Sequence, residues 1–197
     1  MITSKEDYKQ YLEADRISLG KKRDIKSFLF DDIWRFQRTL RKIEYLMNCN
    51  KNHFLIMFFK LYYRRQSVKL GFDIPYNVFG PGLSIAHYGG IIVNGGAKVG
   101  KNCRIHQGVT IGAAAGTSSD APMIGDNVFI GPGAVLLGKI TIGDDIAIGA
   151  NAVITKDFLN GGVTLGGIPG KVISSKGAEN IIIKGLIVYS SLFKRLV

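Results

Sequence analysis

Cysteine and proline are scarce in this chain of 197 residues, which holds two cysteines and five prolines. Cys49 and Cys103 lie far apart and form no CxxC pair, so neither a disulfide framework nor a cysteine-based metal site is expected. The longest apolar run, near residue 55, is far too short to cross a bilayer, and the polar, charged N-terminus predicts no secretory signal. These absences predict a cytoplasmic protein whose thiols are structural.

Negative charge is also in short supply. The net charge is +11, and residues 1–70 combine 16 Lys or Arg with only 8 Asp or Glu. Such an excess suits nucleic acid, an anionic membrane surface or a phosphorylated ligand. No nucleic-acid-binding motif accompanies it, so we expect no nucleic acid partner. Two interpretations of the basic segment stay open: contacts within an oligomer, and peripheral contact with the inner face of a membrane.

Glycine and proline are nearly absent from residues 1–70, which predicts helices. A helix start is indicated at Ser4, with Asp7 three residues later. Apolar residues between about 25 and 47 recur at spacings of three and four, which predicts one amphipathic helix there.

Glycine is plentiful from residue 71 onward, where an aliphatic or aromatic residue recurs at almost every sixth position. These residues are Phe79, Ile85, Val93, Val99, Ile105, Ile111, Ile124, Ile130, Leu136, Ile142, Ile148 and Ile154. A period of six is typical of a prism of stacked coils, in which each hexad forms a short strand and a corner. We predict a mostly β protein with a parallel β-helix of about four coils over 71–173. A helical domain over 1–70 precedes it, and a tail over 174–197, whose packing the sequence leaves open, follows it.

Two breaks interrupt the period, and breaks in a repeat often carry function. Ile85 and Val93 are eight residues apart, and the extra pair falls in the stretch that holds His87. Ile111 and Ile124 are thirteen residues apart, which predicts a small polar loop over 113–122. We interpret that loop either as a tolerated insertion or as a segment that shapes a site.

Three motifs within residues 70–173 resemble those of bacterial serine acetyltransferases. They are Phe72-Asp73-Ile74-Pro75 followed by Ile85-Ala86-His87-Tyr88-Gly89-Gly90-Ile91-Ile92-Val93, Gln107-Gly108-Val109-Thr110-Ile111-Gly112, and Gly167-Ile168-Pro169-Gly170-Lys171. The resemblance implies a left-handed β-helix, a homotrimer with active sites between neighbouring subunits, and acetyl-CoA as co-substrate without a metal. It also implies that His87 is the catalytic base and that Asp73 orients it.

The implied chemistry is sound for these residue types. A hydroxyl group of very high pKa is a poor nucleophile near neutral pH, and a histidine can take its proton while a carboxylate fixes the tautomer. Glycine-rich corners can present backbone donors to the oxyanion that forms.

Departures from the family pattern predict a changed acceptor. The positions that recognise serine in the family are occupied here by Ala86, and by Asp120 and Ala121 in the long loop. The ammonium and carboxylate groups of serine would therefore lose partners. The pattern resembles more closely the relatives that O-acetylate sugars in surface-polysaccharide synthesis. That resemblance implies O-acetylation of a sugar or of a surface-polysaccharide precursor, with serine O-acetylation in cysteine biosynthesis as the alternative.

The remaining site residues are predicted by position. His106 lies one coil after Ala86 and so close to His87, and we group it with Tyr88 and Asp120 as substrate-binding. By resemblance, the residues of the acetyl-CoA groove are Gly112, Ala113, Pro132 and Ala150, with Lys156 and Lys171 for the phosphates.

Two rival functions use the same fold. A zinc hydratase on a β-helix needs three clustered histidines, but His53 lies outside the repeat. A non-catalytic β-helix scaffold would need neither His87 nor acetyl-CoA.

Overall fold

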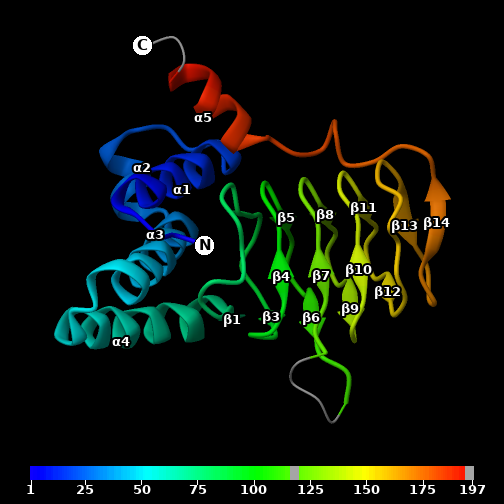
Figure 1. The fold of residues 1–197 in the computed structure, drawn as a ribbon, viewed down its shortest axis with the longest axis horizontal. Helices are drawn as coiled ribbons and strands as arrows, with labels where there is room; N and C mark the ends of the chain where they lie inside the picture. The colour runs from blue at the N-terminus through cyan, green and yellow to red at the C-terminus, as the bar shows by residue number, and fades with distance from the viewer. Residues whose placement is uncertain (116–119, 194–197) are drawn as a thin grey trace.

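The computed structural model describes residues 1–115 and 120–193. The N-terminal part is helical: α1 (Lys5–Ser18), α2 (Ile25–Phe30), α3 (Asp32–Tyr45), the π-helical turn η1 (Leu46–Asn50) and α4 (His53–Leu70). Figure 1 shows these helices gathered at one end of a column of short strands, with α5 (Gly185–Phe193) beside α1. No helix in the described part of the chain is long and apolar enough to cross a membrane.

Residues 25–47 do not form one helix, so that prediction was wrong. The segment divides at Asp31, whose backbone is extended between α2 and α3. The Asp31 carboxylate accepts a hydrogen bond from the backbone N–H of Trp34 at 2.8 Å, which caps the start of α3. The spacing of apolar residues continues across this cap, so periodicity alone could not reveal the break. The predicted helix start at Ser4 is confirmed, because its hydroxyl accepts a hydrogen bond from the N–H of Asp7.

Three sheets form the sides of a prism. Face A contains β1 (Phe72–Asp73), β3 (Ile91–Val93), β6 (Thr110–Gly112), β9 (Val135–Leu137) and β12 (Val153–Ile154). Face B contains β4 (Lys98–Val99), β7 (Met123–Ile124) and β10 (Thr141–Ile142). Face C contains β2 (Ser84–Ile85), β5 (Arg104–Ile105), β8 (Phe129–Ile130), β11 (Ala147–Ile148) and β13 (Thr164–Gly166), and β14 (Lys171–Ser174) adds antiparallel to β13. The five strands of face A define five coils, one more than the hexads suggested.

The residues of the six-residue period line the interior of the prism. All twelve of them are at most 5 % exposed. Strands pair in register one coil apart, as Ile85 does with Ile105 and Ile105 with Ile130. Each coil therefore buries its apolar side against the next. The predicted left-handed parallel β-helix is confirmed.

The corner between faces B and C has the same backbone conformation in every coil. It is held by residues with φ between 55° and 87°: Gly82, Asn102, Asn127, Asp145 and Gly162. Only glycine, asparagine and aspartate adopt this left-handed conformation readily. The asparagines also connect the coils, because the Asn102 amide donates to the Asn127 side-chain oxygen at 2.8 Å.

A fully buried ionic network joins the helices to the first coil. Arg41 donates to Asp15 at 2.8 Å and to Glu44 at 3.0 Å, and all three side chains are at most 2 % exposed. The guanidinium also donates to the carbonyls of Phe79 and Gly80, while Asp15 accepts from the backbone N–H groups of residues 82 and 83. Burial disfavours the cation, but Asp15 and Glu44 outweigh it and raise the pKa of Arg41 above its ordinary value.

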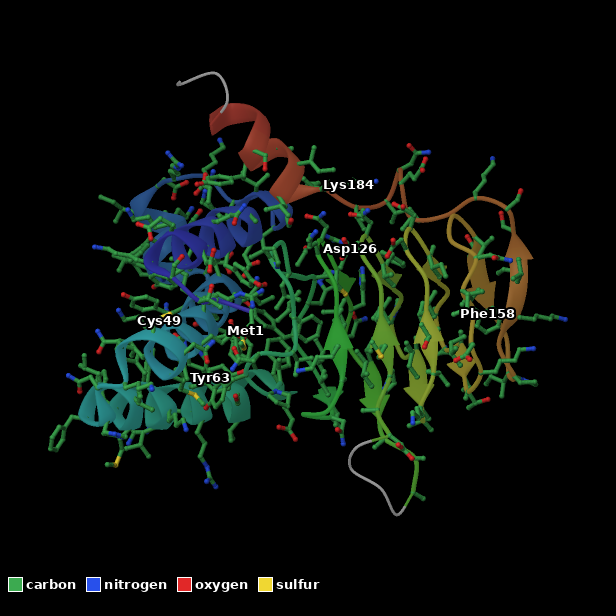
Figure 2. All side chains as sticks on the ribbon, viewed as in Figure 1. Met1, Cys49, Tyr63, Asp126, Phe158 and Lys184 are labelled. Carbon is green, nitrogen blue, oxygen red and sulfur yellow. The ribbon has the colours of Figure 1, made fainter. Side chains whose placement is uncertain are left out.

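The segment after β14 runs back along the prism to the helices. Figure 2 shows Lys184 at the edge of the β-helix that carries Asp126. Lys184 pairs with Asp145 at 3.1 Å, and the N–H of Leu186 donates to Asn102. The N–H of Gly185 then donates to the hydroxyl of Ser18 on α1. The tail, whose packing the sequence left open, thus joins the fourth coil, the second coil and the first helix.

Candidate active site

His87 lies at the corner between faces C and A, in the turn that connects β2 with β3. The side chains of His87 and Tyr88 are exposed. The next coil takes six residues from Ile105 to Ile111 for the same corner, whereas this coil takes eight from Ile85 to Val93. The two extra residues form the turn that presents both side chains to solvent.

The turn is held from both sides by backbone hydrogen bonds. The N–H of Ala86 donates to Ile105 in the next coil, and the N–H of Gly89 donates to the carbonyl of Leu70 at 3.0 Å. Leu70 is the last residue of α4, and Gly71 ends that helix with φ 73°. A side chain on Gly71 would meet the N of Gly90 at 3.2 Å, so glycine permits the close approach. The C-terminal end of α4 thus packs against the His87 turn and fixes its position.

His106 lies beside His87. The ring centroids of the two histidines are 5.7 Å apart, and His106 also contacts the ring of Phe129 at 5.0 Å. The register of β2 with β5 causes this proximity, because it places His106 directly one coil after Ala86.

Two buried polar atoms at this corner have no hydrogen-bond partner in the described part of the chain: Nε2 of His106 and Oε1 of Gln107. Buried polar atoms are usually satisfied by protein, water or ligand. The sequence placed Gln107 in a family motif but assigned it no role, and its unpartnered oxygen next to His106 makes it a candidate site residue. Burial, together with Arg104 and His87, lowers the pKa of His106.

The lowered pKa of His106 predicts a pH-dependent stability. The folded protein binds this proton less tightly than the unfolded chain does, so protonation favours unfolding. The contribution of neutral His106 to the free energy of unfolding should be fully present above pH about 6.5 and should be lost as the pH drops below that value. Urea unfolding at a series of pH values should show a smaller decline for His106→Gln. An equal decline in His106→Gln and in the exposed-site control His53→Gln would contradict this cause.

Asp73 lies on face A, where it pairs in register with Ile92. Its side chain is exposed, and no hydrogen bond to His87 is present among residues 1–115 and 120–193. Asp73 instead borders a cavity of about 480 Å³ beside Tyr63 and Arg64 of α4. Its role in orienting His87 stays a prediction.

The residues predicted for the acetyl-CoA groove fall on two corners of the prism. Pro132 and Ala150 occupy the corner of His87 in later coils, where the N–H of Asn151 donates to Pro132. Gly112, at the end of β6, and Ala113 lie where face A meets face B. Lys156 lies at that second corner two coils later, near Phe158, and Lys171 begins β14. Face A separates the two groups.

The long loop also leaves the prism where face A meets face B, as Figure 1 shows below β6. Its base is closed by a hydrogen bond from the N–H of Ala114 to the carbonyl of Asp120, and Ala121 is buried. Residues 116–119 lie outside the described residues. Within one chain, therefore, Asp120 and His87 lie at different corners, and the structure does not bring them together.

The fold and its corner site define a class: a left-handed hexapeptide β-helix with an exposed histidine at a break in the repeat. Residues 121–156 match the family described as bacterial transferase hexapeptide (six repeats).

Curated relatives narrow the class further. The chain is 42% identical over 105 residues to the serine acetyltransferase of Mycobacterium tuberculosis, covering 52% of this chain and 45% of that protein. It is 40% identical over 101 residues to the serine acetyltransferase of Synechococcus elongatus, covering 51% of this chain and 41% of that protein. The chain spans about half the length, or less, of these relatives.

Solved structures of serine acetyltransferases match a larger part of the chain. The serine acetyltransferase of Brucella abortus superposes with a TM-score of 0.73 at 26% identity, covering 88% of this chain and 72% of that one. The same enzyme in complex with coenzyme A gives a TM-score of 0.69 at 27% identity, covering 87% and 68%. These relatives agree with the predicted class of acyltransferase.

The prediction of a sugar or polysaccharide acceptor was wrong. The relatives and solved structures named above are serine acetyltransferases, which was the alternative. That prediction rested on side chains missing at Ala86 and Ala121. Backbone groups can also serve as partners of an acceptor, so these missing side chains do not define it.

Proposed function

We propose that this protein is an acetyl-CoA-dependent O-acetyltransferase whose acceptor is the side-chain hydroxyl of serine. The exposed His87, in the turn inserted into the repeat, carries the proposal together with the serine acetyltransferase relatives. The CoA complex of one of those relatives supports acetyl-CoA as the donor.

In the proposed reaction His87 takes the proton of the serine hydroxyl. The hydroxyl oxygen attacks the thioester carbonyl of acetyl-CoA and forms a tetrahedral oxyanion. The carbon–sulfur bond then breaks, and the leaving thiolate takes the proton back from the His87 imidazolium. His106 stands 5.7 Å from His87 between ring centroids. With its lowered pKa it stays neutral at pH 7 and can accept or donate one hydrogen bond to the acceptor.

We further propose a homotrimer in which neighbouring chains complete the site. His87 lies at one corner of the prism and the base of the Asp120 loop at another. A neighbour's loop can approach His87 where a chain's own loop does not. Face A and its two corners would then hold acetyl-CoA, with Gly112, Pro132 and Ala150 along the pantetheine arm and Lys156 or Lys171 at the phosphates. Tyr88 and Asp120 would contact the acceptor.

The proposal predicts release of CoA thiol that depends on L-serine. The purified chain with acetyl-CoA should release thiol when L-serine is added and not when L-alanine, which lacks the hydroxyl, replaces it. In the same preparation, acetyl-CoA at about 100 times its Kd should add about 2.7 kcal/mol to the free energy of unfolding.

The two measurements separate donor from acceptor. Stabilisation by acetyl-CoA without serine-dependent thiol release would contradict serine as the acceptor. Absence of any stabilisation at millimolar acetyl-CoA would contradict the transferase itself and favour a scaffold.

A further inference from the structure

Helix α4 has two apolar faces, only one of which is covered. Tyr63, Gln66 and Leu70 are buried, and the Tyr63 hydroxyl donates to the carbonyl of Ile74 at 2.6 Å. The opposite face exposes apolar residues at spacings of three, four and seven. These are Phe54, Met57, Phe58, Leu61 and Val68, which are 60–86% exposed. A stripe of large apolar side chains of this extent marks an interaction surface.

The uncovered face belongs to a strongly basic segment. No Asp or Glu occurs between Glu44 and Asp73, a stretch that holds five Lys or Arg. Arg64 and Arg65 are exposed, and neither has a carboxylate within ion-pair distance in the described part of the chain. Apolar and cationic side chains therefore alternate along one exposed surface.

A separate groove of about 660 Å³ lies between α4 and the helices α1, α2 and α3, on the side of α4 that carries Phe59 and Tyr62. Its lining combines apolar, neutral polar and cationic side chains, without a carboxylate among the described residues: Tyr8, Leu12, Phe28, Leu29, Arg35, Arg38, Thr39, Lys42, Phe59 and Tyr62. The Arg38 guanidinium lies 3.6 Å above the ring of Phe28, and its Nε is buried without a hydrogen-bond partner among the described residues. Burial and the neighbouring cation of Arg35 lower the pKa of Arg38. An anion in the groove would satisfy the unpaired Nε and offset the crowded positive charge.

The charge pattern selects the occupant. A two-fold contact between two copies of this face would bring Arg64 and Arg65 against identical cations, and residues 45–72 contain no acidic residue to offset them. A bilayer with anionic lipids offers phosphates for the cations and an apolar layer for the aromatic and aliphatic side chains. We propose that the α2–α4 end of the protein docks on an anionic membrane surface, with the exposed face of α4 in the interface and a lipid phosphate at Arg38. The inference is independent of the proposed acetyl transfer.

Flotation of the full-length chain with lipid vesicles tests the proposal. We expect the protein to float with vesicles of phosphatidylcholine mixed with phosphatidylglycerol and not with phosphatidylcholine alone. Binding should weaken as ionic strength rises, because the cations lie at the surface. Inorganic phosphate at matched concentration should not displace the protein if a lipid surface, rather than free phosphate, is the ligand.

Paired variants locate the surface. The double substitution Arg64→Gln/Arg65→Gln is expected to weaken vesicle binding about 30-fold, at about 1 kcal/mol per cation. Phe58→Ser/Leu61→Ser should weaken it more than about 30-fold, because both side chains are exposed in the free protein and would be buried in the interface. The matched control Lys98→Gln/Lys139→Gln, which removes the same charge from the β-helix, should leave binding unchanged.

Each outcome decides the proposal. Loss of binding in both α4 variants, with the native mass by light scattering, supports it. No flotation with anionic vesicles, or equal loss in the β-helix control, overturns it. A smaller mass for Phe58→Ser/Leu61→Ser without vesicle binding by the unaltered chain also overturns it, because the face would then join copies of this chain.

Discussion

Replacing His87 by alanine is expected to lower kcat of acetyl transfer by about two to four orders of magnitude, the usual contribution of a positioned general base. The side chain is exposed in a turn held by backbone hydrogen bonds of Ala86 and Gly89, so its loss should leave the fold unchanged. Acetyl-CoA binding should persist, because the residues proposed for the groove, such as Pro132 and Ala150, lie in later coils. Steady-state thiol release and acetyl-CoA titration of the variant measure the two quantities.

His53→Ala is the matched control. His53 is exposed at the first residue of α4, away from the corner site, and its removal should leave turnover unchanged. Near-normal turnover of His87→Ala would remove His87 from the role of base. Loss of acetyl-CoA binding in parallel with kcat would instead indicate a role in holding the donor.

Arg41→Ala is expected to lower the free energy of unfolding by about 3 to 5 kcal/mol, because it leaves Asp15 and Glu44 buried without their cation. For a chain of this length that corresponds to a loss of about 6 to 20 °C in Tm. The carbonyls of Phe79 and Gly80 lose their donor as well, and these residues lead into the strand before His87. Thermal and denaturant unfolding of the two proteins measure the difference.

Arg23→Ala is the matched control, because it removes an arginine from an exposed ion pair of the same protein. Arg23 pairs with Glu13 at 2.7 Å, but its side chain is 74% exposed, and its removal should change stability by less than about 1 kcal/mol. Equal losses in the two variants would show that burial of the Arg41 network contributes nothing. If Arg41→Ala does not fold, Arg41→Lys should fold with intermediate stability, since it keeps the charge but not the fork of donors.

The β-helix could be predicted because each hexad of the sequence specifies its own strand and corner. Every hexad repeats the same requirement, an inward aliphatic residue followed by a corner, so twelve positions such as Ile105 and Ile130 report one geometry independently. The break that carries His87 stands out against such a regular pattern. The helical part has no such redundancy, and the cap at Asp31 divided a segment that periodicity alone would have kept continuous.

The site could be predicted only in part, for a related reason. The register of one coil on the next places His106 near His87, and that register follows from the period. Contacts between corners do not follow from it. The hydrogen bond from Gly89 to the end of α4, and the separation of Asp120 from His87, depend on how the helices and the loop leave the prism.

The return of the tail to α1 has a consequence for how the chain folds. The hydrogen bond between Gly185 and Ser18 joins residues 167 positions apart, and Ser18 also donates to the carbonyl of Ile183. Contacts of such long sequence separation form late, because the chain loses the entropy of closing a long loop before the contacts stabilise it. During synthesis the side of α1 that carries Ser18 therefore stays uncovered until a segment translated long after it arrives, while the coils of the prism can stack one by one. A stalled or shortened chain should carry a finished prism and a first helix held only through Asp15 by Arg41 and the first coil, with its tail-facing side uncovered for chaperones and proteases.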